Sequence, residues 1–570
     1  MNYIKLLLKF CLFLGVTTNS SLKLFSQELS TIKENKPISF TGALNTSGTV
    51  YFTSDDNPQR DPFIWNVSGN FNLNIYEVFD IPFSFVLSKE NKTFKQPSYQ
   101  QYGISPSYKS VTLHLGYRNL NFSKYTMSGI TFLGAGIEFS PEKSLFKCKA
   151  FYGRFARAQQ FIPDNMFNPQ ATFVMPSYER WGYGTMITLG KKDHLFDIVL
   201  FKASDDPASS AIPDSLSVYP AENFVVGLNS KNNILKNLFL EVNYALSAFS
   251  TDIRQGEIYQ ETYTYSNNLG FLFTPRSSSQ FNSVIDVAIN FKPGKVNIGA
   301  KYLRIDPEYK SLGTAFINND VQEFTGNIST TFNENRISLS ANAGLQNNNL
   351  DKSQLATNKR FISALNYTWL ISKNLNLTAI FSNYSTNSMP VQVYMIDSVK
   401  YSQVTRNASL NITETFGDTI IQHSLSGMFS FQGGNTLNQT GDAVSDVSNT
   451  FANAYLAYRL NYLPIGFSVV ASLNYSNFIS GDINTKSIGP SVGVNKFFLK
   501  RKINTGINAT YMNSFGTNAN SNQIINLRLF ANYKINKYHS FTLSVNNLYK
   551  IASGASDHHS QASIAYNLIF

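Results

Sequence analysis

Histidine is the residue type in this chain best suited to acid–base chemistry, and six histidines are present. His558 and His559 follow Asp557, and His194 lies three residues before Asp197. Neither arrangement is accompanied by the G-x-S-x-G or H-E-x-x-H patterns that place a nucleophile or a metal ligand beside its base. Adjacent histidines in a link between two strands are usually solvated. The sequence therefore predicts a protein that is not an enzyme.

Cysteine and acidic side chains give no stronger signal for a metal or a cofactor. Cys148 is the one cysteine outside the apolar stretch near the start of the chain, so a disulfide framework and a cysteine metal site are not expected. Asp205 and Asp206 are adjacent, but they lack the spaced carboxylates of a dedicated calcium loop. We expect no metal site and no cofactor.

The net charge of +11 raises the question of a nucleic-acid partner. Lysine and arginine are scattered singly and gather mainly in short turns such as residues 191–193 and 499–502. Short basic turns are typical of a solvated rim that can face lipid phosphates, whereas nucleic-acid binding needs a continuous basic surface. We expect no nucleic-acid partner.

The first 27 residues have the order of a secretory signal peptide. Lys5 and Lys9 precede an apolar run from Phe10 to Val16, and a short polar stretch follows. This run is much shorter than the ~20 residues that a transmembrane helix needs. We expect residues 1–27 to be removed on export.

Alternation of apolar and polar residues is the main structural signal in the rest of the chain. In Gln561 to Phe570, most apolar side chains fall on one face of an extended strand and small or polar ones on the other. Val67 to Ile75 and Ile503 to Tyr511 repeat this pattern. Each run has about the 9 to 11 residues with which a tilted strand crosses a membrane.

The links between these runs are sorted by length. Short turns are expected at residues 191–193 and 417–418, and longer polar links at residues 159–180, 250–281 and 433–447. Alternating short and long links are typical of membrane barrels, which have periplasmic turns at one rim and extracellular loops at the other. The aromatic residues of 250–281 are compatible with strands that continue above the membrane or with a loop that folds inward.

A chain that ends in such a strand, with Phe570 as its last residue, resembles the outer-membrane β-barrels of Gram-negative bacteria, whose terminal strand closes the barrel and is read by the insertion machinery. The SQE sequence at residues 26–28 and the Asn- and Lys-rich composition resemble exported proteins of the Bacteroidota. The resemblance implies an all-β fold, a single transmembrane antiparallel up-and-down barrel of about 24 to 26 strands, in the cell outer membrane. Residues 28–37 would be a short periplasmic segment and residues 38–570 the barrel.

Charged residues on the face opposite the apolar one are the candidates for lining the lumen. By alternation they are His114, Arg118, Glu138, Arg154, Asp197, Glu241, Asp286, Lys301, Arg459 and Arg528. Acidic and basic members are nearly balanced. They could shape the constriction of a polar channel, or they could be cross-strand ion pairs in a lumen filled by loops.

Two functions follow from these expectations. The first is passive diffusion of small hydrophilic solutes through the barrel. The second is a non-enzymatic interaction role, in which long loops or the lumen dock a surface lipoprotein, a gliding or type IX secretion component, or an external ligand. Expected partners in both cases are outer-membrane lipid or lipopolysaccharide and the barrel-insertion machinery.

Overall fold

A computed structural model describes residues 36–54, 61–89, 100–162, 175–258, 272–354, 356–390, 399–440, 443–517, 522–552 and 555–570. The expected signal peptide, residues 1–27, lies outside these ranges, as does most of the expected periplasmic segment 28–37.

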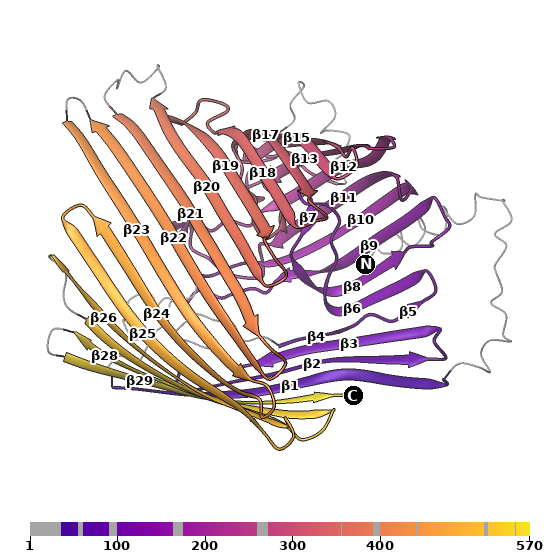
Figure 1. Ribbon diagram of the computed structural model, residues 1–570. Helices are drawn as coiled ribbons and strands as arrows, with labels where there is room; N and C mark the ends of the chain where they lie inside the picture. Colours follow the sequence, from indigo (N-terminus) through magenta and orange to yellow (C-terminus); the bar gives the residue numbers. More distant parts are fainter. Residues whose placement is uncertain are drawn as a thin grey trace.

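One antiparallel sheet of 27 strand segments forms the wall of the molecule (Figure 1). The segments are β1 (Ile38–Thr53), β2 (Phe63–Ile75), β3 (Phe79–Ser88), β4 (Gln100–Ile104), β5 (Ser107–Tyr108), β6 (Val111–Asn119), β8 (Thr131–Phe139), β9 (Phe146–Ala156), β10 (Glu179–Lys191), β11 (His194–Asp206), β12 (Glu222–Leu235), β13 (Leu238–Ser250), β14 (Ser279–Phe291), β15 (Val296–Ile305), β17 (Val321–Phe332), β18 (Ile337–Asn347), β19 (Ala356–Leu370), β20 (Leu375–Pro390), β21 (Val399–Gly417), β22 (Ile421–Thr440), β23 (Ala443–Tyr462), β24 (Phe467–Ser480), β25 (Ile483–Phe498), β26 (Ile503–Thr517), β27 (Asn522–Lys534), β28 (His539–Ala552) and β29 (Ala555–Ile569). Residues Asp214–Leu216 form a single 3₁₀ turn.

The segments β4 and β5 form one interrupted strand of the wall. Both pair with β3 on one side and with β6 on the other. Pro106, which has no N–H to donate, lies between them. The wall therefore has 26 strands, within the predicted range.

The last strand closes the barrel, as the sequence predicts. β29 pairs antiparallel with β1. At the end of this ladder Gly42 N donates to Phe570 O over 2.9 Å, and Phe570 N donates to Gly42 O over 3.0 Å. The Phe570 ring stacks on Phe40 with a centroid distance of 4.9 Å. Because the first and last strands pair, the sheet has no free edge there.

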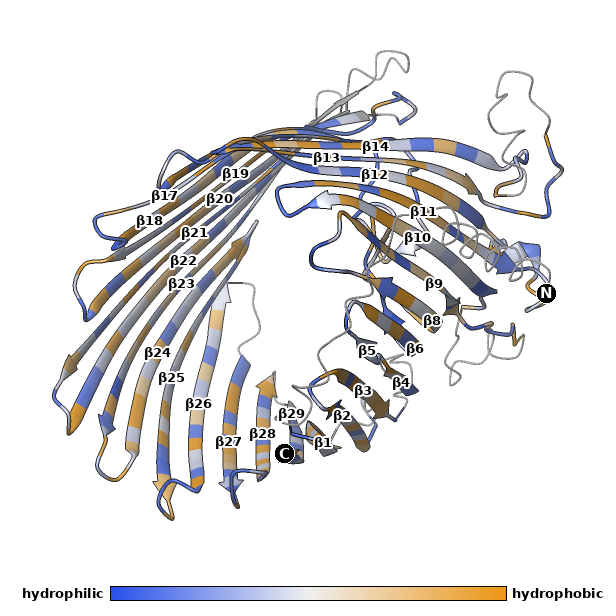
Figure 2. Cartoon of the chain, turned by 90° about the vertical axis from the view of Figure 1, so that its right-hand side faces the viewer, coloured by the Kyte–Doolittle hydropathy of each residue, from blue (hydrophilic) through white to orange (hydrophobic). Residues whose placement is uncertain are grey.

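The two faces of the wall differ in polarity, most regularly from β24 to β28, where apolar and polar residues alternate along each strand (Figure 2). Leu456, Leu473, Val492, Ile507 and Leu529 are exposed large side chains on the outer face. Backbone groups in a closed barrel pair between strands, so the outer face can contact hydrocarbon without unsatisfied hydrogen bonds. The barrel is thus a transmembrane one of the outer-membrane type.

One predicted long link is wrong. Residues 433–447 are mostly strand, because β22 ends at Thr440 and β23 begins at Ala443. Paired strands satisfy their backbone hydrogen bonds wherever they run, so a polar stretch does not have to be a loop. The turn predicted at 191–193 falls between β10 and β11, and the one at 417–418 falls between β21 and β22.

Two links turn into the barrel and were not predicted to do so. Residues 120–130 join β6 to β8 and include β7 (Met127–Ser128), and residues 306–320 join β15 to β17 and include β16 (Gly313–Thr314). β7 and β16 pair in parallel, and Met127 of β7 is buried in one cluster with side chains of the wall. We call these two links the inner segments.

Candidate functional site: the barrel lumen

An apolar cluster fixes the inner segments to the wall. Leu120, Phe122, Tyr125 and Met127 from one segment and Tyr309 from the other are buried in it. The wall contributes side chains from β8, β9 and β11 to β15, which are Phe132, Phe151, Val199, Phe201, Ala203, Val225, Ala245, Val284, Leu303 and Ile305. The inner segments therefore cover this part of the inner wall.

Hydrogen bonds position the inner segments within this cluster. The Tyr125 hydroxyl donates to Asp286 Oδ2 on β14 over 2.5 Å. Tyr309 Oη donates to the Tyr125 carbonyl over 2.8 Å, and Ser311 Oγ to the Thr126 carbonyl over 2.5 Å. The two segments are thus bonded to each other as well as to the wall.

A second set of bonds joins residues 306–320 to β12 and β13. The side chain of Asn223 accepts from Leu312 N over 3.0 Å, and Ser247 Oγ donates to the Lys310 carbonyl over 2.6 Å. Asn223 and Ser247 are both buried and are bonded to each other over 2.8 Å. Buried polar groups with full sets of partners favour one fixed arrangement.

Three predicted lumen residues lie together at β6 and β8. His114 Nε2 is 3.1 Å from Glu138 Oε1, and Lys149 Nζ is 2.9 Å from Glu138 Oε2. Arg118 donates to Ser84 Oγ over 2.7 Å. These side chains lie on the inner face and are engaged with neighbouring strands.

Four further predicted residues on the inner face also have partners. Asp197 accepts from Thr188 over 2.6 Å, and Glu241 is 3.4 Å from Lys231. Asp286 is buried and lies 3.7 Å from both Lys301 and Lys124.

Arg154 lies on the outer face, which differs from the expectation. It pairs in register with Leu133 and Trp181, both on the outer side, and alternates with the inward Phe151. The alternation rule assigns apolar residues to the outside, but here Phe151 faces inward because the inner segments cover it. Arg154 forms an ion pair with Glu179 over 3.1 Å.

Arg459 and Arg528 lie in the other half of the barrel and are exposed. The cross-strand neighbours of Arg528 are Asn508 and Asn546, and those of Arg459 are Ser424 and Val470. Neither arginine has a carboxylate directly opposite it. These two arginines are the members of the predicted set that lie on the uncovered side of the barrel.

The inner wall of this half is uncovered within the part of the chain that the structure describes. Among the described residues after Thr386, only Gly489 and Gly493 are buried. Small polar side chains line this face and bond across strands, as in Ser472 with Ser491 over 2.6 Å and Asn532 with Thr542 over 2.7 Å. Within the described residues, one side of the lumen is thus filled and the other side is an uncovered polar wall.

The link 250–281 does not fold inward in its described part. Leu272 and Phe273 pack on Phe224 and Ala248, which lie opposite each other on β12 and β13. Both side chains face outward, because Val225, the residue after Phe224, and Ala245, three residues before Ala248, face the inner cluster. Arg276 is 3.2 Å from Glu222 on the same outer face. Of the two alternatives left open by the sequence, the inward constriction is therefore excluded for these residues.

Asp205 and Asp206 lie at the end of β11 and not in a loop. Asp205 is buried. Its carboxylate accepts hydrogen bonds from Arg180 Nε over 2.7 Å and from Ala221 N over 3.0 Å.

Among the described residues, no group of three or more His, Cys, Asp or Glu side chains could hold a metal ion. Within the same residues, no helix has the length and apolar character to span a membrane.

The burial of residues 120–130 was not predicted, although their composition indicates it. Residues 120–130 contain Leu120, Phe122, Tyr125 and Met127, which is a high density of large apolar side chains for a link. Such side chains in a link need cover, and apolar inward positions such as Phe201 provide it.

The closed antiparallel wall with an apolar outer face and a partly open polar lumen defines the class: the chain is a β-barrel of the kind found in Gram-negative outer membranes. No family model matches it, and no curated protein does. Solved structures similar to it include the FrpB iron transporter from Neisseria meningitidis, F5-1 variant, at 10% identity and a TM-score of 0.35, covering 95% of this chain and 83% of that one. Pseudomonas aeruginosa OccK11 (OpdR) has 11% identity and a TM-score of 0.33, covering 66% and 95%. The P pilus usher PapC translocation pore has 10% identity and a TM-score of 0.24, covering 94% and 99%. At these values no functional argument follows from the likeness.

Proposed function

We propose that the protein is an outer-membrane channel for passive diffusion of small hydrophilic solutes. The observation that carries this proposal is the open polar side of the lumen, where the described residues of β21 to β29 are not covered on their inner face. A barrel of 26 strands encloses a lumen wide enough for water unless it is filled. The inner segments fill only the side formed by β8 to β15.

Electrostatics predict a weak preference for anions. On the filled side the carboxylates of Glu138, Glu241 and Asp286 each lie close to lysines. On the open side Arg459 and Arg528 face uncharged cross-strand neighbours. An unpaired cation at a pore wall attracts anions and disfavours cations.

Single-channel conductance of the refolded barrel in a planar bilayer tests the proposal. We expect large, steady conductance steps, with a reversal potential that indicates anion preference under a salt gradient. Absence of steps from a barrel shown to be folded would exclude the channel.

A further inference from the structure

The wall of the barrel is discontinuous beside β6. Pairing between β4 and β6 covers only Gly103 with Gly116 and Ile104 with Leu115. Before Gly103, the β4 residues Gln100–Tyr102 pair with β3 but not with β6 among the described residues. After Gly116, Tyr117 on β6 pairs with β8 but not with β4 among the same residues. A seam therefore opens between β4 and β6 at the end of these strands.

Glycine at the last paired position permits the close approach that precedes the seam. Gly116 has a φ of +90°, and a Cβ there would lie 2.5 Å from the Tyr102 carbonyl oxygen. Only glycine adopts such a backbone conformation at this contact without strain. The seam thus begins at a defined point of the fold.

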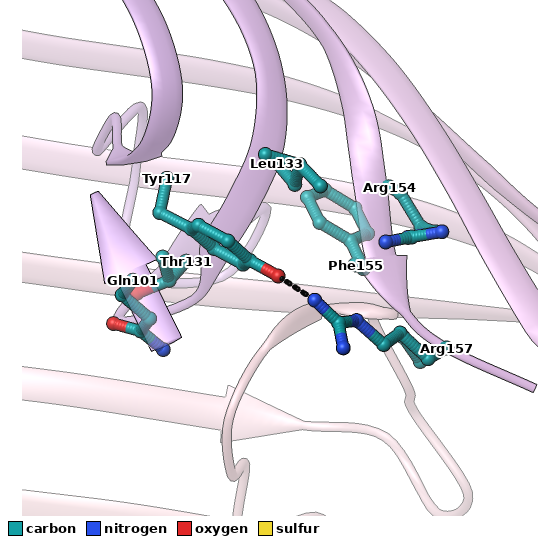
Figure 3. A pocket seen from close by; sticks show the side chains of 8 residues that line it. Gln101, Tyr117, Thr131, Leu133, Arg154, Phe155 and Arg157 are labelled. Atoms are coloured by element: carbon teal, nitrogen blue, oxygen red, sulfur yellow. Dashed lines mark hydrogen bonds between the residues drawn. The ribbon is translucent and has the colours of Figure 1, made fainter. Parts of the chain in front are cut away.

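A small pocket of about 100 Å³ lies at the seam (Figure 3). Two guanidinium groups are among its lining side chains, those of Arg154 and Arg157, with Leu133 beside them. Arg157 donates to the Tyr117 hydroxyl over 2.7 Å. The pocket therefore combines cationic groups with an apolar wall.

Aromatic side chains place this pocket at a membrane boundary. Tyr102 and Tyr152 are 58% and 53% exposed on the outer face, and Tyr152 stacks on Trp181 with a centroid distance of 5.3 Å. Outward aromatic residues of a barrel typically lie at the level of the lipid headgroups. The pocket is on the rim that carries the long links, which is the extracellular one.

The protein groups that the structure describes at the pocket do not balance its charge. Glu179 accepts from Arg154 over 3.1 Å and from the Trp181 indole over 2.7 Å. Two guanidinium groups against one carboxylate leave one positive charge in surplus. Arginine forms bidentate bonds with phosphate through its planar set of donors.

We propose that Arg154 and Arg157 form a binding site for a phosphate group of an outer-leaflet lipopolysaccharide. The phosphate binds the two guanidinium groups at the seam, and the acyl chains lie along Leu133 and Tyr152 on the outer wall. This site is on the outer face, so it does not depend on whether the lumen conducts.

Trp181 provides a local reporter for the test. The full chain with Trp65→Phe and Trp369→Phe retains Trp181 as its single tryptophan. Its fluorescence is titrated in detergent with bisphosphorylated lipid A, with the dephosphorylated lipid, and with inorganic phosphate. Folding of each variant is verified by circular dichroism and by the heat-dependent shift in electrophoretic mobility.

In this background, Arg154→Gln combined with Arg157→Gln is expected to weaken lipid A binding at least about tenfold, since two charge-assisted contacts are lost. The single change Arg157→Gln keeps the pair of Arg154 and Glu179 and should weaken binding about threefold or more. Arg406→Gln is the matched control, because Arg406 is an exposed arginine on the outer face of β21 with uncharged neighbours across the ladder.

Three results would overturn the proposal. Equal affinity for the dephosphorylated lipid would show that phosphate is not recognised. An equal loss with Arg406→Gln would show only diffuse surface charge. Displacement of lipid A by inorganic phosphate at similar concentrations would assign the pocket to free phosphate instead of a lipid.

Discussion

The Tyr125 hydroxyl donates to Asp286 Oδ2 over 2.5 Å and joins two residues that are 161 positions apart in the chain. Tyr125 belongs to an inner segment and Asp286 to β14 of the wall, and both side chains are buried. Hydrogen bonds to a charged acceptor are stronger than those between neutral groups. This contact bonds one inner segment directly to the wall of the barrel.

Removing the hydroxyl should loosen the inner segments. We expect Tyr125→Phe to lower the free energy of unfolding by about 1.5 to 3 kcal/mol, because a buried carboxylate loses a donor. Urea unfolding of the barrel in detergent measures the change. Faster hydrogen exchange of residues 120–130, with unchanged exchange in β26, would locate the effect.

Tyr244→Phe is the control for this change. Tyr244 lies on the neighbouring strand β13 but on the outer face, where it is exposed. Equal destabilisation by the two substitutions would contradict the role that we assign to the bond with Asp286.

The packed cluster should matter more than any single hydrogen bond. Phe201 is fully buried and stacks on Phe155 with a centroid distance of 6.0 Å. Phe201→Ala is expected to cost about 3 to 5 kcal/mol, since it leaves a cavity beneath the inner segments. Its sequence neighbour Leu200 faces outward and is 37% exposed, so Leu200→Ala should cost only about 1 kcal/mol. Chemical unfolding of both variants provides the comparison, and equal costs would argue against a packed lumen.

The barrel could be predicted because the pattern that specifies it lies within each single strand. Period-2 alternation decides which face of each strand is apolar, as in Ile503 to Tyr511, and β26 forms there. Closure through Phe570 follows from the same pattern. These features need only the side chains within one strand and its ladder partners.

The filled side of the lumen was not predictable, because its cause is a contact between distant parts of the chain. Met127 and Gly313 pair across 186 positions, which no local pattern encodes. That contact also reverses the polarity rule on β9, where Phe151 faces inward and Arg154 outward. On β27, where no described inner segment covers the wall, the alternation of Leu527 and Leu529 with Arg528 places Arg528 on the inner face.

Arg528 should influence the ion selectivity of the proposed pore. Its cross-strand neighbours are both asparagines, so Arg528→Glu replaces an unpaired positive charge with a negative one. We expect the reversal potential under a salt gradient to shift toward cation preference with little change in conductance. Arg118→Glu makes the same change of charge at a residue that is bonded to Ser84 beside the filled side, and it should shift the potential less. A larger shift for Arg118→Glu would place the ion path on the other side of the lumen.

A loop at the extracellular rim should lose order in acid. Hydrogen bonds from Arg254 hold the pKa of Asp252 below its ordinary value of 3.8. Asp252 and Arg254 lie in the link between β13 and β14, outside the strands, and Arg254 also bonds Asp214 over 3.0 Å. A carboxyl group with a lowered pKa contributes stability above its ordinary pKa, and this contribution is lost as the pH falls toward its folded value.

Limited proteolysis of residues 251–258 with an acid-active protease therefore should accelerate as the pH falls below about 4. Asp252→Asn should make cleavage fast at neutral pH and remove most of the pH dependence. Retention of the full pH dependence in Asp252→Asn would assign the effect to another group.

Phe570 should determine how readily the barrel closes. Its backbone forms two hydrogen bonds with Gly42, and its ring stacks on Phe40 and lies 5.7 Å from Phe71. Phe570→Ala keeps the backbone bonds but removes both aromatic contacts, which are worth about 0.5 to 1.5 kcal/mol each beyond the buried area. We expect slower refolding into lipid vesicles and a smaller folded fraction. Ile569→Ala is the matched control, because Ile569 is exposed on the opposite face of β29. If both variants refold alike, then the ladder between β1 and β29 closes the barrel without help from the terminal ring.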